Sequence, residues 1–592
     1  MKNNKSFLIL FLVVALFSCN QQKDIAKISF NIGKNDKYIL LPMEDLGDEL
    51  KINVSVDGIK MNSYFMRLAQ SKVDYWMPFE ISDYQGKNIS LEIAANIPKN
   101  SLFLTLSKIS DKFEYNSNEK FRPQFHFTPP YGWMNDPNGM LYYAGEYHLS
   151  YQWNPFGNRW QNMSWGQAVS KDLIHWEHLP VALLPDSLGT IFSGSAVVDE
   201  NNTAGFQIGK EKVLLAFYSQ SERGGQWQSL AYSNDKGRTW TKYEKNPILK
   251  HESARDFRDP KVFWYEPTQK WIMILAVGQV MEIYSSVDAK TWTFESKFGE
   301  GYGSHAGVWE CPDLFELAVE GNPKLKKWVL ICNINPGGPS GGSASQYFIG
   351  NFDGKNFICE DKKEEIRWMD WGKDHYAFVS WSDIPQKDGR RIGIAWMSNW
   401  EYANDAPTLH FRSAMSIPRE LTLMRVNGKF ILRNAPVKEI ENLRGEKTEF
   451  SNIEITKNQI VKDLPTSGIY ELLMDIKKQS AQKFGFKLKN PKGEEALVLF
   501  DFKNNTFSFD RTNSGIVNFN DRFSALVVAP LMAKQVYRLR LLVDKSSVEA
   551  FIDNGEVSMT NLVFPNEPYS KIEFFTENGN STVNTLKIIE LK

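Results

Sequence analysis

Cysteine and histidine are both scarce in this sequence. Its 592 residues include four cysteines and eight histidines. Cys19 lies close to the N-terminus, and the remaining three, Cys311, Cys332 and Cys359, are an odd number that cannot all pair with one another. No Cys-x-x-Cys motif or histidine cluster accompanies them, so neither a disulfide framework nor a zinc site is supported. We expect these three thiols to be buried structural side chains.

The sequence also lacks a charge imbalance and long apolar segments. Its 69 Lys and Arg residues nearly balance 70 Asp and Glu residues, so no electrostatic feature favours a nucleic-acid partner. The one unbroken apolar run, residues 7–17, is too short for a bilayer, which needs about 20 such residues. With 42% hydrophobic and 23% charged residues, the composition is typical of a folded globular protein. The length predicts two or three domains.

The N-terminal segment has the pattern of a targeting signal. Lys2 and Lys5 precede the apolar run, and residues 16–19, which end in Cys19, resemble a bacterial lipobox. Residues 1–19 are therefore predicted to be a lipoprotein signal peptide with Cys19 as the lipidated residue. Asn20 stands where an Asp would indicate retention in the inner membrane. We expect an exported protein with a lipid anchor in the outer membrane, on its periplasmic or cell-surface face.

Alternating apolar and polar residues predict an all-β protein. In residues 24–117, short runs such as 51–56 and 102–106 alternate with a period of two, which is typical of strands in a small β-sandwich-like domain. The same alternation returns in residues 442–592 and predicts a C-terminal β-sandwich. The polar stretch 111–120 is predicted to link the first domain to the next.

Residues 121–435 contain an internal repeat. A polar turn followed by an aromatic residue recurs at roughly sixty-residue spacing, and its Asp residues are predicted to form turns. A second series of polar segments precedes strand-like runs at five places. These five openings predict a five-bladed β-propeller, in which the inner strands converge on one channel. The turn residues are Asp172, Asp235, Asp288 and Asp353, and the openings are 135–139, 192–195, 258–260, 310–313 and 372–376.

Three acidic residues occupy comparable points of three predicted blades. Asp136 and Asp259 are each followed directly by Pro, and Glu310 is followed by Pro one residue later. Each of the two Asp-Pro segments taken alone is equally compatible with a turn. If the blades converge, however, the three carboxylates meet in one pocket, where like charges push their pKa values apart. Glycoside cleavage with retention requires such a carboxyl pair, about 5–5.5 Å apart.

These segments resemble a known enzyme family. Residues 133–139 (Trp-Met-Asn-Asp-Pro-Asn-Gly), 258–260 (Arg-Asp-Pro) and Glu310-Cys311 are similar to the three signatures of glycoside hydrolase family 32, the invertases, inulinases and levanases. The resemblance runs from about residue 121 to the C-terminus and implies a propeller followed by a sandwich. It implies that Asp136 is the nucleophile, Glu310 the acid/base and Asp259 the transition-state stabiliser. The positions that it places around a terminal fructose are Asn135, Gln152, Trp160, Phe192, Ser193, Arg258 and Asp374.

The resemblance implies a retaining β-fructosidase that releases fructose from the ends of levan or inulin chains, with sucrose as a further candidate substrate. An endo-acting levanase, a fructosyltransferase and a non-catalytic fructan-binding propeller remain alternatives. No metal or organic cofactor is implied, and the linkage preference and oligomeric state stay open. Three departures from the family pattern, Gln161, Gln167 and His375, are expected near the pocket rim.

The N-terminal domain lies outside the family pattern. It could bind polysaccharide, or it could act as a spacer or packing element. The sequence favours the second role, since Tyr75-Trp76 is the one evident aromatic platform.

Overall fold

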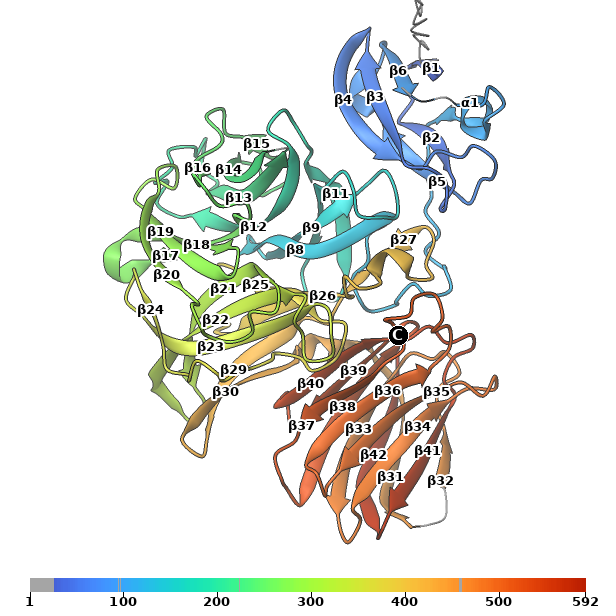
Figure 1. Cartoon of the computed structure of the whole chain (residues 1–592), viewed down its shortest axis with the longest axis vertical. Coiled ribbons are helices and arrows are strands. Elements are labelled where there is room, and N and C mark those ends of the chain that lie inside the picture. The colour runs from blue at the N-terminus through green and yellow to red at the C-terminus, as the bar shows by residue number, and fades with distance from the viewer. Residues whose placement is uncertain (1–25, 94, 96, 223, 457–459) are drawn as a thin grey trace, which may run out of the picture.

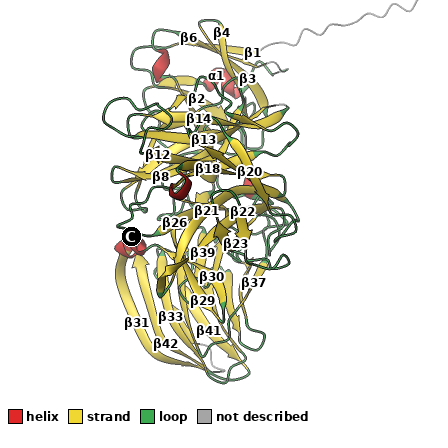
Figure 2. Ribbon diagram, turned by 90° about the vertical axis from the view of Figure 1, so that its left-hand side faces the viewer, coloured by secondary structure: helices red, strands yellow, loops and turns green. Residues whose placement is uncertain are grey.

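The structure is a computed structural model that describes residues 26–93, 95, 97–222, 224–456 and 460–592. The predicted signal peptide and Cys19 lie outside the described residues. Three strand-rich regions follow one another along the long axis of the molecule (Figures 1 and 2). In the described ranges the helices are one α-helical turn and four short 3-10 segments, and none is long and apolar enough to cross a membrane. The chain is therefore all-β, as its alternating sequence predicts.

The N-terminal domain consists of two small sheets packed face to face. One sheet has the order β1-β6-β3-β4 and the other has the order β5-β2-β7. Apolar side chains from both sheets, including Ile39, Ile52 and Ile89, are fully buried between them. The strands are β1 (Ala26–Asn31), β2 (Tyr38–Met43), β3 (Leu50–Val56), β4 (Ile59–Met66), β5 (Tyr75–Glu80), β6 (Asn88–Ile93) and β7 (Lys108–Ser110), and a 3-10 turn spans Ser82–Tyr84.

One strand prediction in this domain is wrong. Residues 102–106 form a single helical turn, α1 (Leu102–Leu106), and not a strand. Phe103 alone is buried in this turn and packs into the domain core, while Thr105 and Leu106 face solvent. A short apolar run does not by itself distinguish a strand from a helical turn, because both can bury one large side chain.

The central region is a ring of strands built from four hydrogen-bonded sheets, the last of which is nine-stranded (Figure 1). Its inner strands, β8, β12, β17, β21 and β25, contact one another in sequence order, and β25 contacts β8 to close the ring. From each inner strand the chain passes outward through antiparallel neighbours. The ring also closes through a parallel pairing of β27 with β8, in which Phe411 lies opposite Gly132. The inner strands therefore line a common axis.

The strands of the ring have the following bounds. The first two sheets contain β8 (Gly132–Tyr143), β9 (Glu146–Asn154), β10 (Ser164–Ser170), β11 (Trp176–Leu183), β12 (Thr190–Asp199), β13 (Val213–Glu222), β14 (Gly225–Ser233), β15 (Thr241–Lys242), β16 (Leu249–Lys250) and β27 (Phe411–Arg412). The third sheet contains β17 (Arg258–Tyr265), β18 (Lys270–Val277), β19 (Val280–Ser286) and β20 (Thr293–Phe298). The nine-stranded sheet contains β21 (Val308–Val319), β22 (Asn322–Asn335), β23 (Ala344–Phe352), β24 (Phe357–Cys359), β25 (Tyr376–Ser380), β26 (Arg391–Met397), β28 (Ala414–Met415), β29 (Arg419–Val426) and β30 (Lys429–Pro436). Short 3-10 turns span Glu266–Thr268, Ala403–Asp405 and Lys438–Leu443.

The repeated Asp residues form turns, which confirms their predicted role. Asp172 Oδ1 accepts backbone hydrogen bonds from Ile174 at 3.0 Å and His175 at 2.8 Å. Asp235, Asp288 and Asp353 accept equivalent bonds from backbone N–H groups two to four residues downstream. Each carboxylate therefore accepts hydrogen bonds from backbone N–H groups of its own turn. Each of these turns leads to the outer strand of a sheet.

The C-terminal domain is a sandwich of two six-stranded sheets (Figure 2). Its core contains many phenylalanines, including Phe484, Phe500 and Phe574, all of which are fully buried. One sheet contains β31 (Arg444–Ile455), β42 (Ser581–Leu591), β33 (Tyr470–Lys478), β38 (Val536–Asp544), β39 (Ser547–Ile552) and β40 (Val557–Leu562). The other contains β32 (Ile460–Asp463), β41 (Lys571–Glu577), β34 (Lys483–Lys489), β35 (Glu495–Asp501), β36 (Thr506–Asn513) and β37 (Leu526–Pro530).

A buried polar network joins the sandwich to the ring. His126 Nδ1 lies 2.8 Å from Asp544 Oδ2, and its Nε2 lies 3.0 Å from Glu549 Oε1. Glu549 also accepts a hydrogen bond from Arg419, whose other terminal nitrogen donates to Asp370. Burial alone would lower the pKa of His126, but its hydrogen bonds to the two carboxylates raise the value to about 9. A charged imidazole is therefore held between two carboxylates in the domain contact.

Candidate active site

A β-bulge interrupts each of the five inner strands near its start. The register shifts lie between residues 134 and 137, 191 and 194, 258 and 261, 310 and 313, and 376 and 379. A bulge leaves a residue out of the ladder and redirects its side chain. The first four of these bulges contain most of the residues predicted to bind or transform a sugar.

Proline explains part of the sequence signature around the bulges. Pro137, Pro260 and Pro312 each fall within one of these register shifts. Proline has no N–H group for a ladder hydrogen bond, so within sheets it is confined to edges and bulges. Asp259 and Cys311 adopt φ values of +64° and +42°, in the left-handed region. The acid-proline pairs therefore mark sites where the strand departs from regular pairing.

Asp136 lies on β8 and is held by three neighbours. Ser193 Oγ donates to its Oδ2 at 2.6 Å, and Asn135 Nδ2 donates to its Oδ1 at 3.0 Å. The thiol of Cys311 lies 3.3 Å from Oδ2. Asn135 is itself oriented by the indole of Trp133, which donates to its Oδ1 at 2.8 Å. These contacts fix the orientation of the Asp136 carboxylate.

Asp259 lies on the other side of the Cys311 sulfur atom. Its Oδ2 accepts a hydrogen bond from the Cys311 backbone N–H at 3.0 Å and lies 3.6 Å from the thiol. Its own backbone N–H donates to Ser219 Oγ at 2.8 Å. Cys311 is buried, as predicted, and is a component of the carboxylate cluster. The signal was its position directly after Glu310 in the family signature.

Glu310 completes the cluster and is the most exposed of the three acids, with 21% of its side chain accessible. Arg258 donates to its Oε1 from Nε at 3.1 Å and from Nη2 at 2.9 Å. Tyr376 donates its hydroxyl hydrogen to Oε2. Arg258 Nε also lies 3.9 Å from Asp259 Oδ2, so this guanidinium bridges two of the carboxylates. Tyr376 is a site residue that the sequence did not single out.

The electrostatics follow from burial and crowding. Burial raises the pKa of Asp136, although the hydrogen bond from Ser193 acts in the opposite direction. Burial raises the pKa of Asp259 to about 7; Arg258 opposes this shift, while Glu310 and Asp136 add to it. Like charges in a partly dry pocket thus favour a shared proton. The cluster can hold ionised and protonated carboxyl groups side by side, which is the requirement of acid/base and nucleophilic chemistry.

The other predicted pocket residues fall into three groups. Ser193 and Asn135 contact Asp136 directly, whereas Phe192 and Trp160 meet edge to face with ring centroids 6.2 Å apart. Trp160 is 40% exposed, which is unusual for an aromatic residue in this part of the chain. Gln152 is buried on β9, and its amide nitrogen has no hydrogen-bond partner in the described part of the chain. A buried donor of this kind is stabilised by an acceptor such as a sugar hydroxyl.

Asp374 belongs to a different network. It is fully buried, its Oδ1 accepts from the Tyr402 hydroxyl at 2.5 Å, and its Oδ2 accepts from Arg511 Nη1 at 2.5 Å. The backbone N–H of Leu562 donates to the same Oδ2 at 2.8 Å. Because Arg511 and Leu562 belong to the sandwich, Asp374 joins the two domains. These contacts give Asp374 a structural role, and its contact with substrate stays a prediction.

Two of the three departures from the family pattern are also structural. Gln167 is buried and donates to the backbone carbonyl of Gly237. His375 is buried, and its Nδ1 lies 3.1 Å from Ser345 Oγ. The expectation that they lie at the pocket rim is wrong, because both fill space between sheets. Gln161 differs, since its side chain donates to Glu49 of the N-terminal domain at 3.3 Å.

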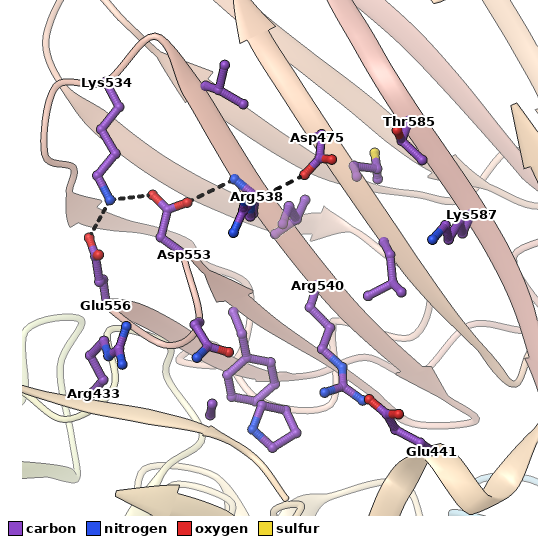
Figure 3. Close-up of a pocket in the computed structure, with 18 of the residues that line it drawn as sticks. Arg433, Glu441, Asp475, Lys534, Arg538, Arg540, Asp553, Glu556, Thr585 and Lys587 are labelled. Atoms are coloured by element: carbon purple, nitrogen blue, oxygen red, sulfur yellow. Dashed lines mark hydrogen bonds and ion pairs between the residues drawn. The ribbon is translucent and has the colours of Figure 1, made fainter. Parts of the chain in front are cut away.

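A hollow between β30 and the C-terminal domain is lined by many charged side chains (Figure 3). Several of these side chains pair with one another. Lys534 donates to Asp553 at 2.8 Å and Glu556 at 2.7 Å, and Arg538 lies 3.8 Å from Asp475. Such partly exposed ion pairs compensate each other's charge and contribute little to stability. This hollow therefore lacks the crowded, buried acids of the cluster around Asp136.

Comparison with known proteins now identifies the family. Residues 126–434 match the description "Glycosyl hydrolases family 32 N-terminal domain", and residues 439–590 match "Glycosyl hydrolases family 32 C terminal". The chain belongs to glycosyl hydrolase family 32. It is therefore a glycoside hydrolase, as the sequence signatures predict. Residues 26–125 match a separate "Domain of unknown function (DUF4980)".

Curated relatives and solved structures agree with this membership of family 32. A levanase of Bacillus subtilis is 50% identical over 498 residues, which covers 83% of this chain and 74% of the relative. An extracellular exo-inulinase of Aspergillus niger is 38% identical, covering 78% of this chain and 92% of the relative. The crystal structure of an exo-inulinase from Aspergillus awamori superposes with a TM-score of 0.76 at 34% identity, over 81% of this chain and 99% of that one.

Proposed function

We propose that this family 32 enzyme is an exported fructan β-fructosidase that releases fructose from chain ends with retention of configuration. In this proposal Asp136 is the nucleophile, Glu310 the acid/base and Asp259 the group that binds the sugar hydroxyls. The observation that supports it is the convergence of the three carboxylates. The Cys311 thiol contacts both Asp136 and Asp259, and Arg258 connects Asp259 to Glu310.

The reaction has two steps. Ionised Asp136 attacks the anomeric carbon, and the proton of Glu310 passes to the departing glycosidic oxygen as that bond breaks. A covalent fructosyl-enzyme forms. Water then attacks the same carbon, Glu310 takes its proton, and Asp136 leaves as a carboxylate. Hydrogen bonds from the ring hydroxyls to Asp259 strengthen as positive charge develops on the sugar.

The names of the curated relatives support a choice of substrates. The curated names are levanase and exo-inulinase, so we propose levan and inulin as substrates, with sucrose as a third candidate. Product analysis on all three separates the alternatives. An exo-acting hydrolase releases fructose alone, an endo-acting levanase releases oligosaccharides, a fructosyltransferase lengthens chains, and a non-catalytic binder leaves the substrate unchanged.

The proposal includes the architecture. The closed ring of the inner strands β8, β12, β17, β21 and β25 supports a five-bladed propeller over residues 121–435, between an N-terminal domain at 24–117 and a sandwich at 442–592. Curated relatives named extracellular support export, and we propose that Cys19 carries a lipid anchor in the outer membrane. Labelled palmitate should enter the wild-type protein in cells and should be absent from the C19A variant. Equal labelling of the two proteins excludes this anchor.

The catalytic assignment is tested by trapping the intermediate. With β-fructosyl fluoride, whose leaving group needs no proton, the Glu310→Gln variant should accumulate a covalent adduct of one fructosyl group, observed by mass spectrometry of the intact protein. The Asp136→Asn variant should form none, and on levan or inulin each variant should lose about 100-fold or more in kcat. Unchanged thermal unfolding serves as the folding control. Turnover at the wild-type rate by either variant contradicts the assignment.

A further inference from the structure

The loop between β9 and β10, residues 155–163, carries Trp160 and lies against the N-terminal domain. Its Phe156 is 8% exposed and belongs to the apolar core of that domain. The ring centroid of Phe156 lies 4.2 Å from that of Tyr64 and 5.6 Å from that of Phe79. A residue of the catalytic ring is thus part of the hydrophobic core of its neighbour, and the loop cannot move away without exposing this core.

Polar contacts fasten the same loop on both sides of Trp160. The side chain of Asn162 pairs with the backbone of Phe65: its Oδ1 accepts from Phe65 N–H at 2.8 Å, and its Nδ2 donates to Phe65 C=O at 2.7 Å. Phe65 lies on β4, an edge strand whose outward N–H and C=O groups are otherwise unpaired in the sheet. On the other side of Trp160, Asn158 Nδ2 donates to Asp45 Oδ1 at 2.8 Å.

Trp160 stands between these anchors and points toward the cluster of aromatic residues beside the carboxylates. Its ring meets Phe192 and Trp400 edge to face, with centroids 6.2 and 6.5 Å away. Trp400 in turn stacks on Trp133 at 5.7 Å. Trp133 donates to Asn135, the neighbour that orients Asp136. A continuous line of contacts therefore runs from the N-terminal domain to the nucleophile.

We propose that the N-terminal domain is a component of the substrate-binding machinery, because it holds the 155–163 loop in the position where Trp160 can bind a fructosyl unit of the chain. This inference rests on the proposed function and deepens it. A domain that served only as a spacer would not need to receive Phe156 into its core or to pair its edge strand with Asn162. The contacts assign Phe156 and Asn162 as positioning residues, and Trp160 as the residue that they position.

Three full-length variants test this role. Phe156→Ala leaves a cavity in the core of the N-terminal domain. Asn162→Gly removes the side-chain amide that pairs with Phe65, and glycine tolerates the φ of +51° at this position. Asp45→Ala removes the carboxylate of the N-terminal domain that accepts from Asn158. Each should raise KM for levan or inulin oligosaccharides by about tenfold and change kcat by less than about threefold, because binding and not chemistry is disturbed. Hydrogen exchange of amides 157–162 should accelerate in all three.

Phe113→Ala is the matched control. The ring of Phe113 meets Tyr131 in the same domain contact and Tyr38 on β2, with centroids 5.3 and 6.4 Å away. This variant should lower the melting temperature and leave KM and the exchange of 157–162 unchanged. The proposal is overturned if Asn162→Gly and Asp45→Ala fold normally and keep the wild-type KM, or if Phe113→Ala raises KM equally. Absence of activity in the wild type would refute the proposed function instead, while the exchange measurement would still test the anchoring.

Discussion

The buried imidazole between the ring and the sandwich predicts how stability depends on pH. His126 has a pKa of about 9 in the folded protein and about 6.5 when the chain is unfolded. A group whose pKa is raised on folding stabilises the fold fully below its unfolded pKa, and this stabilisation is lost as pH rises through the folded value. The difference corresponds to about 3 kcal/mol. Asp544 and Glu549 have lowered pKa values, so they do not titrate in this range.

The measurement is the free energy of unfolding in urea, followed by tryptophan fluorescence, between about pH 6.5 and about pH 9.5. The wild type should lose about 3 kcal/mol more than the His126→Gln variant over this interval. At the lower pH the variant should be less stable by about 3–5 kcal/mol, because two buried carboxylates lose their cation. His175→Gln, at a histidine whose side chain is 71% exposed, is the control and should follow the wild type. Parallel curves for wild type and His126→Gln would refute the reasoning.

Three further predictions concern the site and the domain contact. Ser193→Ala removes a hydrogen bond that lowers the pKa of Asp136, so the acid limb of the kcat/KM profile should move toward higher pH; an unmoved limb contradicts this. Tyr376→Phe removes the hydroxyl that donates to Glu310 and should lower kcat about tenfold with KM nearly unchanged, as steady-state kinetics on inulin can check. Asp374→Ala should lower the melting temperature and leave KM within about twofold, since it breaks a buried pair with Arg511; a raised KM at an unchanged melting temperature would support its predicted substrate contact.

Many residues of the candidate site could be predicted from the sequence, because short sequence motifs mark the places where the inner strands depart from regular pairing. Each acid precedes a proline by one or two residues, and proline marks the bulges that the structure contains. The alternation of apolar and polar residues predicted the all-β class for the same reason, since side chains on a strand alternate between faces. Residues 102–106 were the exception, because one buried phenylalanine satisfies either a strand or a helical turn.

What sequence could not supply were contacts between distant segments. The partner of Asp374 is Arg511, and the anchor of the Trp160 loop lies in another domain, at Phe65. Neither pair has a spacing or a composition that marks it. Tyr376 lies two residues after Asp374 in the same motif. In the structure, however, Tyr376 donates to Glu310, whereas Asp374 pairs with Arg511 of the sandwich.

The parallel pairing of β27 with β8 constrains when the enzyme can be assembled. β8 carries the proposed nucleophile, and its first two residues pair with a segment about 280 residues later in the chain, which takes tens of seconds to synthesise at about 5–20 residues per second. Until Phe411 and Arg412 arrive, the start of β8 at Gly132 and Trp133 lacks this native partner and is open to mispairing. A translation product that ends before this segment should therefore be recovered as aggregate, even though every proposed catalytic residue is already present in it.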